Sequence, residues 1–166
     1  MTIRSLLFVP GDRPERFPKA AASGADALIL DLEDSVAPEN KPAARAAIAE
    51  WLNGERPVRS FVRINPLDSE HVRADLAAVI GVRPDGLVLP KSQGAASVWQ
   101  LIEIAGRDCP PILPIASETP SAVFGLGSYG EAADRLAGLT WGAEDLPAAI
   151  GAATARNPDG SYTQPY

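Results

Sequence analysis

ILPIASE (Ile112–Glu118) and LTWGAED (Leu139–Asp145) are two short apolar runs that each end in acidic residues, and they decide the fold. Runs of this length after Pro or Gly signals are typical of buried strands in a parallel sheet. In α/β folds, chemistry lies just past the carboxyl ends of such strands. Neighbouring strands lie about 4.8 Å apart. We therefore expect Glu118 to share one small, hard cation with Glu144 or Asp145.

Six runs along the chain have the turn-bounded, apolar pattern of buried strands. They are Leu6 to Val9, Ala27 to Leu30, Arg59 to Ile64, Gly86 to Leu89, Ile112 to Ala116 and Gly138 to Trp141. Helical spacing of apolar residues occurs between them, at 44–52, 72–80 and 98–105. Strand alternating with helix predicts βα units around a parallel sheet.

The later units share one length, because Val62, Val88, Pro114 and Thr140 are each 26 residues apart. Regular units without a GxGxxG turn favour a (β/α)8 barrel of the TIM type over a Rossmann fold. Only about six of the eight units are present, and the tail 157–166 is loop-like. We expect one domain, residues 1–166, that forms an incomplete TIM barrel. Open edge strands are normally paired or covered, so we also expect a homo-oligomer or a longer natural protein.

Composition limits the classes of partner and compartment. The chain has 166 residues and a net charge of −6. It lacks the basic cluster on which nucleic-acid binding relies. The one cysteine, Cys109, excludes an internal disulfide and favours a reducing compartment. Neither a signal-peptide pattern at Met1–Ser5 nor a membrane-length apolar run is present. We expect a cytoplasmic protein that binds neither nucleic acid nor membrane.

Charged residues follow the other predicted strands as well. Two carboxylates that leave coordination positions open suit Mg²⁺ or Mn²⁺, whereas one His and one Cys argue against zinc. Arg63, at the end of the third run, has the planar fork that grips a substrate carboxylate. Lys91, after the fourth run, is a candidate substrate contact. Glu33 and Asp34 follow the second run.

Each of these residues also has a plainer interpretation. Acidic residues after a strand often cap the next helix, and Glu33 or Asp34 would precede a helix that starts near Glu39. Arg63 alone is equally consistent with a structural ion pair, and Lys91 with a solvated loop. Their shared placement at strand ends favours a site.

Six motifs occur in order along the chain. They are RSLLFVPG (4–11), DLEDSV (31–36), VRIN (62–65), LPK (89–91), ET (118–119) and WGAEDL (141–146). Together they closely resemble the citrate lyase beta-subunit family, which comprises acyl-CoA or acyl-carrier-protein lyases of the 2-keto-acid aldolase superfamily. The resemblance runs from about residue 3 to residue 150, nearly the whole chain.

The resemblance implies a Mg²⁺ site at Glu118 and Asp145, and it selects Asp145 over Glu144. It further implies that Arg63 binds the carboxylate of a 2-keto acid such as oxaloacetate, glyoxylate or pyruvate.

Supporting roles are implied for four more residues. Glu33 and Asp34 would support Arg63 or order water near the metal. Arg13 and Lys19 would contact the phosphates of CoA, which carries the thioester. Members of this family continue beyond the last motif, and that further segment completes their barrel.

The implied reaction is carbon–carbon bond cleavage. The substrate would be a 3-hydroxy-3-carboxyacyl thioester of the citryl, citramalyl or malyl type, on CoA or a carrier protein, and the products a 2-keto acid and an acyl thioester. One alternative is a metal-dependent aldolase acting on free hydroxy-keto acids. Another is a truncated barrel that is non-catalytic or depends on assembly.

Overall fold

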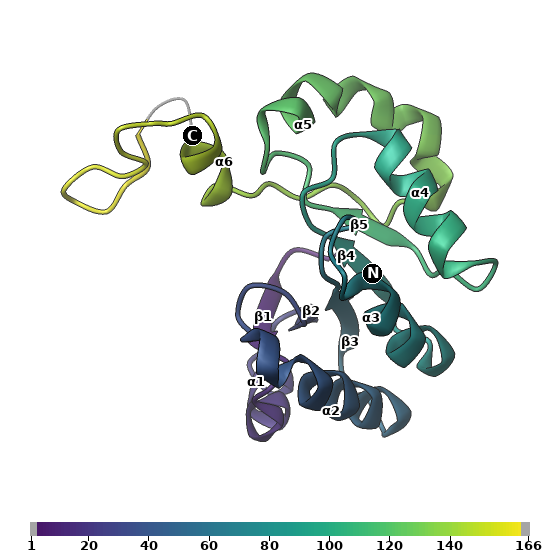
Figure 1. Cartoon of the computed structure of the whole chain (residues 1–166). Coiled ribbons are helices and arrows are strands. Elements are labelled where there is room, and N and C mark those ends of the chain that lie inside the picture. The colour runs from purple at the N-terminus through teal and green to yellow at the C-terminus, as the bar shows by residue number, and fades with distance from the viewer. Residues whose placement is uncertain (1–2, 164–166) are drawn as a thin grey trace.

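The computed structural model describes residues 3–163, so Met1, Thr2 and the last three residues of the predicted loop-like tail lie outside the described residues. Five parallel strands form one sheet in the order β1-β2-β3-β4-β5 (Figure 1). They are β1 (Leu6–Pro10), β2 (Ala27–Asp31), β3 (Arg59–Arg63), β4 (Gly86–Leu89) and β5 (Ile112–Pro114). The order never reverses, as it would in a doubly wound sheet.

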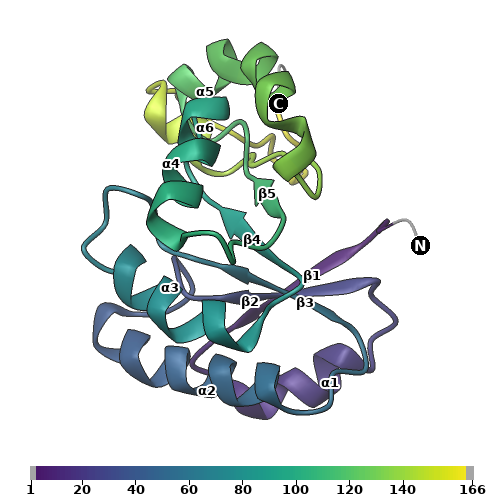
Figure 2. The ribbon, with the colours of Figure 1, turned by 90° about the vertical axis from the view of Figure 1, so that its right-hand side faces the viewer.

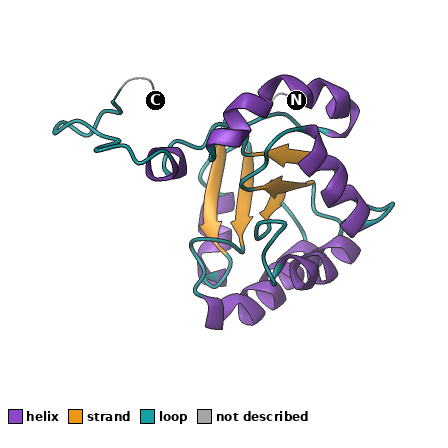
Figure 3. Cartoon of the chain, turned by 45° about the horizontal axis from the view of Figure 1, so that its top comes forward, coloured by secondary structure: helices purple, strands orange, loops and turns teal. Residues whose placement is uncertain are grey.

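Helices alternate with the strands, as predicted. They are α1 (Phe17–Ala21), α2 (Lys41–Asn53), α3 (Val72–Val79), α4 (Ala95–Ala105), α5 (Pro120–Gly125) and α6 (Asp145–Ala149), with 3-10 segments at Pro14–Arg16, Pro38–Asn40, Ile80–Val82 and Leu126–Arg135. Figure 2 shows α1, α2 and α3 along one face of the sheet. In Figure 3, α6 and the C-terminal loop project away from the sheet. None of the helices within residues 3–163 has the length and apolar character needed to cross a membrane.

The prediction of a sixth strand at Gly138 to Trp141 is wrong, because no regular strand forms there. The chain there does run parallel to β5, but only through isolated bridges that join Ile112 to Leu136 and Ile115 to Thr140. Between these bridges the outer segment contains one residue more than β5, which is the mark of a bulge. Gly138 lies in this interval with φ +154°, a value that L side chains rarely adopt. The extra residue therefore interrupts the ladder.

The spacing of 26 residues does not equal the register of the sheet. Val62 pairs with Leu87, and Val88 pairs with Leu113. Paired positions on these strands are therefore 25 residues apart.

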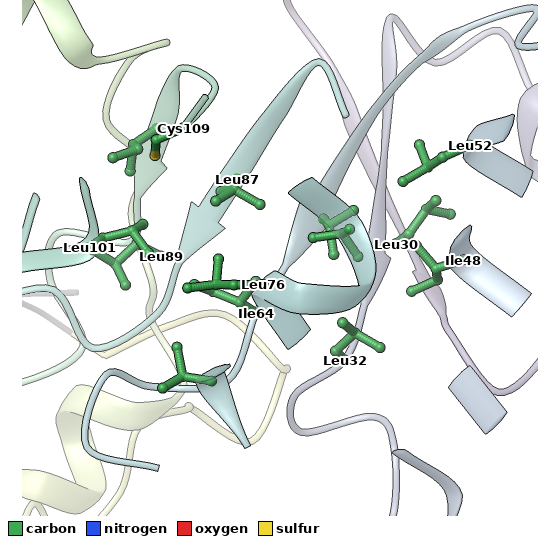
Figure 4. Close-up of a cluster of buried hydrophobic side chains, with 14 of the residues drawn as sticks. Leu30, Leu32, Ile48, Leu52, Ile64, Leu76, Leu87, Leu89, Leu101 and Cys109 are labelled. Atoms are coloured by element: carbon green, nitrogen blue, oxygen red, sulfur yellow. The ribbon is translucent and has the colours of Figure 1, made fainter. Parts of the chain in front are cut away.

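Alternating side chains on the strands form two clusters. The larger cluster packs between the sheet and the helices, and Figure 4 shows Leu30 and Ile48 at one end of it and Leu89 and Leu101 at the other. The smaller cluster lies on the opposite, inner face and consists of Ala27, Ile29, Phe61, Val88, Leu113 and Ile115. Because successive side chains alternate, Asp31 and Arg63 share this inner face with Ile29 and Phe61.

Candidate active site

Asp31 and Arg63 are register partners at the ends of β2 and β3. The guanidinium of Arg63 grips the Asp31 carboxylate with two hydrogen bonds of 2.7 Å, from Nε to Oδ1 and from Nη2 to Oδ2. Asp31 also accepts hydrogen bonds from the backbone N–H groups of Glu33 and Ser35 and from the Ser35 hydroxyl. The fork of Arg63 is thus fixed on one edge before any ligand binds.

Glu33 connects Arg63 to Lys91. One carboxylate oxygen of Glu33 lies 2.8 Å from Nη1 of Arg63, and the other accepts a 2.8 Å hydrogen bond from Nζ of Lys91. Glu33 is buried, whereas Asp34 is mostly exposed and its carboxylate lies 3.8 Å from Nη1 of Arg63. We call Asp31, Glu33, Arg63 and Lys91 the Arg63 cluster.

Burial and opposite charges compete in setting the ionisation of this cluster. Burial raises the pKa of Asp31, but the Arg63 guanidinium outweighs that effect and holds the pKa below its usual value. The pKa of Glu33 is raised, because burial outweighs the attraction of Lys91 and Arg63. Burial lowers the pKa of Lys91, and the hydrogen bond to Glu33 reverses this into a net rise. The cluster is a closed set of ion pairs.

Lys91 joins the cluster to Glu118 through its backbone. Its φ is +52°, which is uncommon for a residue with a side chain. In this conformation its backbone N–H donates a 2.5 Å hydrogen bond to Oε2 of Glu118, while its Nζ lies 4.0 Å from Oδ1 of Asp145. We call Glu118 and Asp145 the carboxylate pair.

The side chain of Glu118 is held in a tight buried space. A Cβ on Gly142 would lie 2.6 Å from Cγ of Glu118 and 2.7 Å from Cγ2 of Ile115, so glycine is needed for this approach. Ser117 fixes the position of Gly142, because its hydroxyl donates to the Gly142 carbonyl and accepts from the Gly142 N–H. The segment that carries Asp145 is thereby tied to the end of β5.

Burial raises the pKa of Glu118 to about 7, and the nearby carboxylates of Glu33 and Asp145 add to the rise. The hydrogen bond from the Lys91 backbone opposes it. Within residues 3–163, no hydrogen bond reaches Oε1 of Glu118. A buried carboxylate beside other carboxylates favours a cation.

The carboxylate pair offers the kind of oxygen ligands that a small, hard cation such as Mg²⁺ prefers. Both side chains line a cavity of about 460 Å³, together with Arg63, Phe8 and Trp141. Among the described residues no group of three or more His, Cys, Asp or Glu side chains could hold a metal. Mg²⁺ is commonly held by only one or two carboxylates, with water and substrate oxygens as the other ligands.

The neighbouring acid, Glu144, also borders the cavity but is engaged elsewhere. Its carboxylate accepts hydrogen bonds from Nη2 of Arg156 and from the hydroxyl of Tyr162, at 2.6 Å for the tyrosine. Both partners belong to the C-terminal loop. The structure thus distinguishes Glu144 from Asp145, which faces Lys91.

The candidate CoA contacts lie apart from these residues. Arg13 is exposed on the loop after β1, and its Nε lies 3.9 Å from Asp12. Lys19 lines a groove of about 520 Å³ beside β1, together with Arg16. Phe8 borders both this groove and the main cavity.

The structure therefore brings together six of the eight residues singled out from the sequence. They are Glu33, Asp34, Arg63, Lys91, Glu118 and Asp145. It argues against helix capping by Glu33 or Asp34, since Ala37 and Asn40 precede the next helical segments without a side-chain cap.

Asp31 was missed as a site residue. The alternation of side chains along the strand could have revealed it, because Asp31 lies two residues after Ile29 on the inner face. In the sheet it is the register partner of Arg63.

The fold and the site define a (β/α)-barrel protein with an acidic site at the carboxyl ends of its strands. Among solved structures, the chain resembles a citrate lyase beta subunit from Mycobacterium tuberculosis complexed with oxaloacetate and magnesium. The TM-score is 0.78 at 44% identity, over 95% of this chain and 66% of that one. It also resembles protein CitE from the same organism in complex with magnesium, acetoacetate and coenzyme A. The TM-score is 0.77 at 44% identity, over 95% of this chain and 55% of that one.

Residues 4–163 match the HpcH/HpaI aldolase/citrate lyase family, and the chain belongs to that family. A citrate lyase subunit beta-like protein of M. tuberculosis is 44% identical over 94% of this chain and 53% of its own length. An L-malyl-CoA/beta-methylmalyl-CoA lyase of Cereibacter sphaeroides is 38% identical over 91% of this chain and 51% of its own length. The chain spans about half the length of these curated relatives and forms a partial barrel, as expected from the sequence.

Proposed function

We propose that the chain carries the keto acid and metal site of a carbon–carbon lyase. Its substrate would be a citryl-, citramalyl- or malyl-type 3-hydroxy-3-carboxyacyl thioester, on CoA or a carrier protein. Its products would be a 2-keto acid and an acyl thioester. The observation that carries the proposal is that Arg63 and the carboxylate pair line one cavity. The relatives with magnesium, oxaloacetate, acetoacetate and coenzyme A support it.

Glu118 and Asp145 would hold Mg²⁺, or Mn²⁺, which supplies a Lewis acid to the oxygens of the keto acid. Arg63 would bind the carboxylate of the keto acid. Two of its five N–H groups are taken by Asp31, and Nη1 also lies 2.8 Å from Glu33, so the substrate carboxylate would share Nη1 with Glu33 and use the remaining N–H on Nη2. Lys91 would hold Glu33 and Glu118 in place and contribute positive charge at the substrate.

The apolar wall of the cavity would limit water around the reacting carbons. Phe8 lies under the Arg63 guanidinium, 4.9 Å from its ring centroid to Cζ. Asp34 would support Arg63 from the exposed rim. Arg13 and Lys19 would meet the phosphates of CoA.

Calorimetry tests the metal assignment. Mg²⁺ would be titrated in the presence of oxaloacetate or pyruvate into the unmodified protein, Glu118→Ala and Asp145→Ala. We expect each substitution to weaken binding by at least about tenfold. Glu144→Ala tests the choice between the adjacent acids and should retain binding, as should Glu103→Ala on the exposed face of α4. Unchanged binding in Glu118→Ala or Asp145→Ala would overturn the assignment.

A second candidate is a metal-dependent aldolase that acts on free hydroxy-keto acids. The same site would serve, and the family includes aldolases by its description. A screen of thioesters and free acids with Mg²⁺ separates the two candidates: cleavage of thioesters alone supports the lyase, and cleavage of free acids supports the aldolase.

A third candidate is an assembly-dependent or non-catalytic barrel. The chain spans about half the length of its curated relatives, and the sheet within residues 3–163 has five strands. Among residues 3–163 no strand pairs with the outer edge of β1, and we expect the chain to form a homo-oligomer through such edges. Light scattering of the purified chain measures this, and a monodisperse, cooperatively melting monomer would contradict it.

A further inference from the structure

Lys41, the first residue of α2, is a buried lysine whose ammonium is enclosed by neutral oxygens. Its Nζ donates hydrogen bonds to the carbonyl of Leu32 at 2.7 Å, the carbonyl of Glu33 at 3.0 Å and Oδ1 of Asn65 at 2.8 Å. These three bonds use all its donors. Two of the acceptors lie in the loop that presents Glu33 to Arg63.

Asn65 extends the network to a second buried charge. Its Nδ2 donates to the carbonyl of Leu32 at 2.9 Å and to Oδ2 of Asp75 at 2.7 Å, and its backbone N–H also donates to Oδ2 of Asp75. Nε of Arg45 donates to Oδ1 of Asp75 at 2.7 Å. Lys41, Asn65 and Asp75 are each at least 95% buried. We call these three residues the buried relay.

The buried relay holds the backbone on both sides of the Arg63 cluster. On the β2 side it fixes the carbonyls of Leu32 and Glu33, directly after Asp31. On the β3 side it fixes Asn65, two residues after Arg63. The distances between Asp31, Glu33 and Arg63 therefore depend on two backbone segments that the relay joins.

Stability alone does not account for a lysine at this position. A positive charge at a helix N-terminus opposes the helix dipole, and Lys41 begins α2. Removing an ion from water is costly, even where hydrogen bonds satisfy it. Burial accordingly lowers the pKa of Lys41, although the more distant carboxylates of Asp75, Asp31 and Glu33 oppose the shift.

We propose that Lys41, Asn65 and Asp75 are positioning residues that set the geometry of Arg63 and Glu33 for ligand binding. The role in ligand binding rests on the proposed function. The role in geometry does not, because it concerns the ligand-free cluster.

Hydrogen exchange of the Arg63 side chain tests the geometry without a ligand. Nε–H of Arg63 donates to Asp31, and its ¹⁵N NMR signal can be assigned by its loss in Arg63→Lys. In Lys41→Met and the isosteric Asp75→Asn, we expect this proton to exchange at least about tenfold faster. Leu101→Ala on α4, which creates a cavity in the larger hydrophobic cluster (Figure 4), is the control for general destabilisation and should leave the exchange unchanged. Equal exchange in all proteins, or equal acceleration in the control, would overturn the proposal.

Calorimetry of oxaloacetate binding with Mg²⁺ then tests the consequence for ligand. The relay variants should bind about tenfold more weakly than Leu101→Ala, at a temperature where all are folded. If the unmodified protein binds no keto acid, the proposed function fails while the exchange result still decides the positioning role. If exchange is faster but affinity is unchanged, the positioning role in binding is refuted.

Discussion

Arg63 and the carboxylate pair line one cavity, and the charges of the Arg63 cluster and of the carboxylate pair are balanced differently. In the Arg63 cluster each charged group has a partner of opposite charge at 2.7–2.8 Å. In the carboxylate pair, Glu118 is held by a backbone N–H, and among residues 3–163 the nearest cationic group to Asp145 is Nζ of Lys91, 4.0 Å away. The Arg63 cluster is paired in the protein alone, whereas under the proposed function the carboxylate pair would gain its balance from a cation. The carboxylates of the Arg63 cluster are thus closely paired with cations, whereas those of the carboxylate pair are not.

Among these substitutions, removal of Arg63 should have the largest effect on stability. Arg63→Met leaves Asp31 and Glu33 buried without their guanidinium, and the free energy of unfolding should fall by about 3–5 kcal/mol. Urea denaturation measures the change. Arg59→Met, an exposed arginine on the same strand, is the control and should change stability by under about 0.5 kcal/mol. A loss below about 1 kcal/mol in Arg63→Met would mean that the cluster is not a closed set of ion pairs.

Neutralising Glu118 should raise the free energy of unfolding, whereas Arg63→Met should lower it. Its pKa is about 7 in the folded, metal-free protein against an ordinary 4.5. The folded state therefore holds the proton more tightly, and stability falls as pH rises from about 4.5 through about 7. Glu118→Gln should remove this loss and stabilise the protein at pH ~8 by about 1–3 kcal/mol, with little gain near pH ~4.

Denaturation in a chelating buffer at several pH values measures this gain. Glu103→Gln, exposed on α4, is the control. A gain of the same size at both ends of the pH range would show that it does not come from ionisation of Glu118.

Asp34 should give the smallest effect and mark the outer limit of the Arg63 cluster. It is mostly exposed and lies 3.8 Å from Arg63, so Asp34→Asn should change stability by less than about 1 kcal/mol. Raising the salt concentration should shrink even that difference. Thermal melts at low and high salt check this, and a loss comparable to that of Arg63→Met would place Asp34 inside the cluster.

The parts of this architecture that depend on local pattern could be predicted from the sequence. The first five strands and helices α2, α3 and α4 followed from apolar runs and helical spacing, whereas the short helices α1, α5 and α6 were not predicted; the acids at strand ends marked the edge where the candidate site lies. The bulge beside β5 could not be predicted, because it depends on how one extra residue is absorbed between two bridges. The partnership of Asp31 with Arg63 depends on strand register, and the buried relay on how two helices pack against two loops.

The backbone hold on Glu118 has a consequence for mutational scanning. At position 91 the backbone N–H donates a hydrogen bond to Glu118, and the side-chain ammonium donates one to Glu33. Replacement by alanine deletes the ammonium but leaves the amide donor, so an alanine scan would register only half of what this residue does. Proline is the substitution that removes the donor, and its ring also forbids the φ of +52° found here. Glycine would keep the donor and relieve the strain. A three-way comparison of alanine, glycine and proline would therefore separate two contributions that a conventional scan merges.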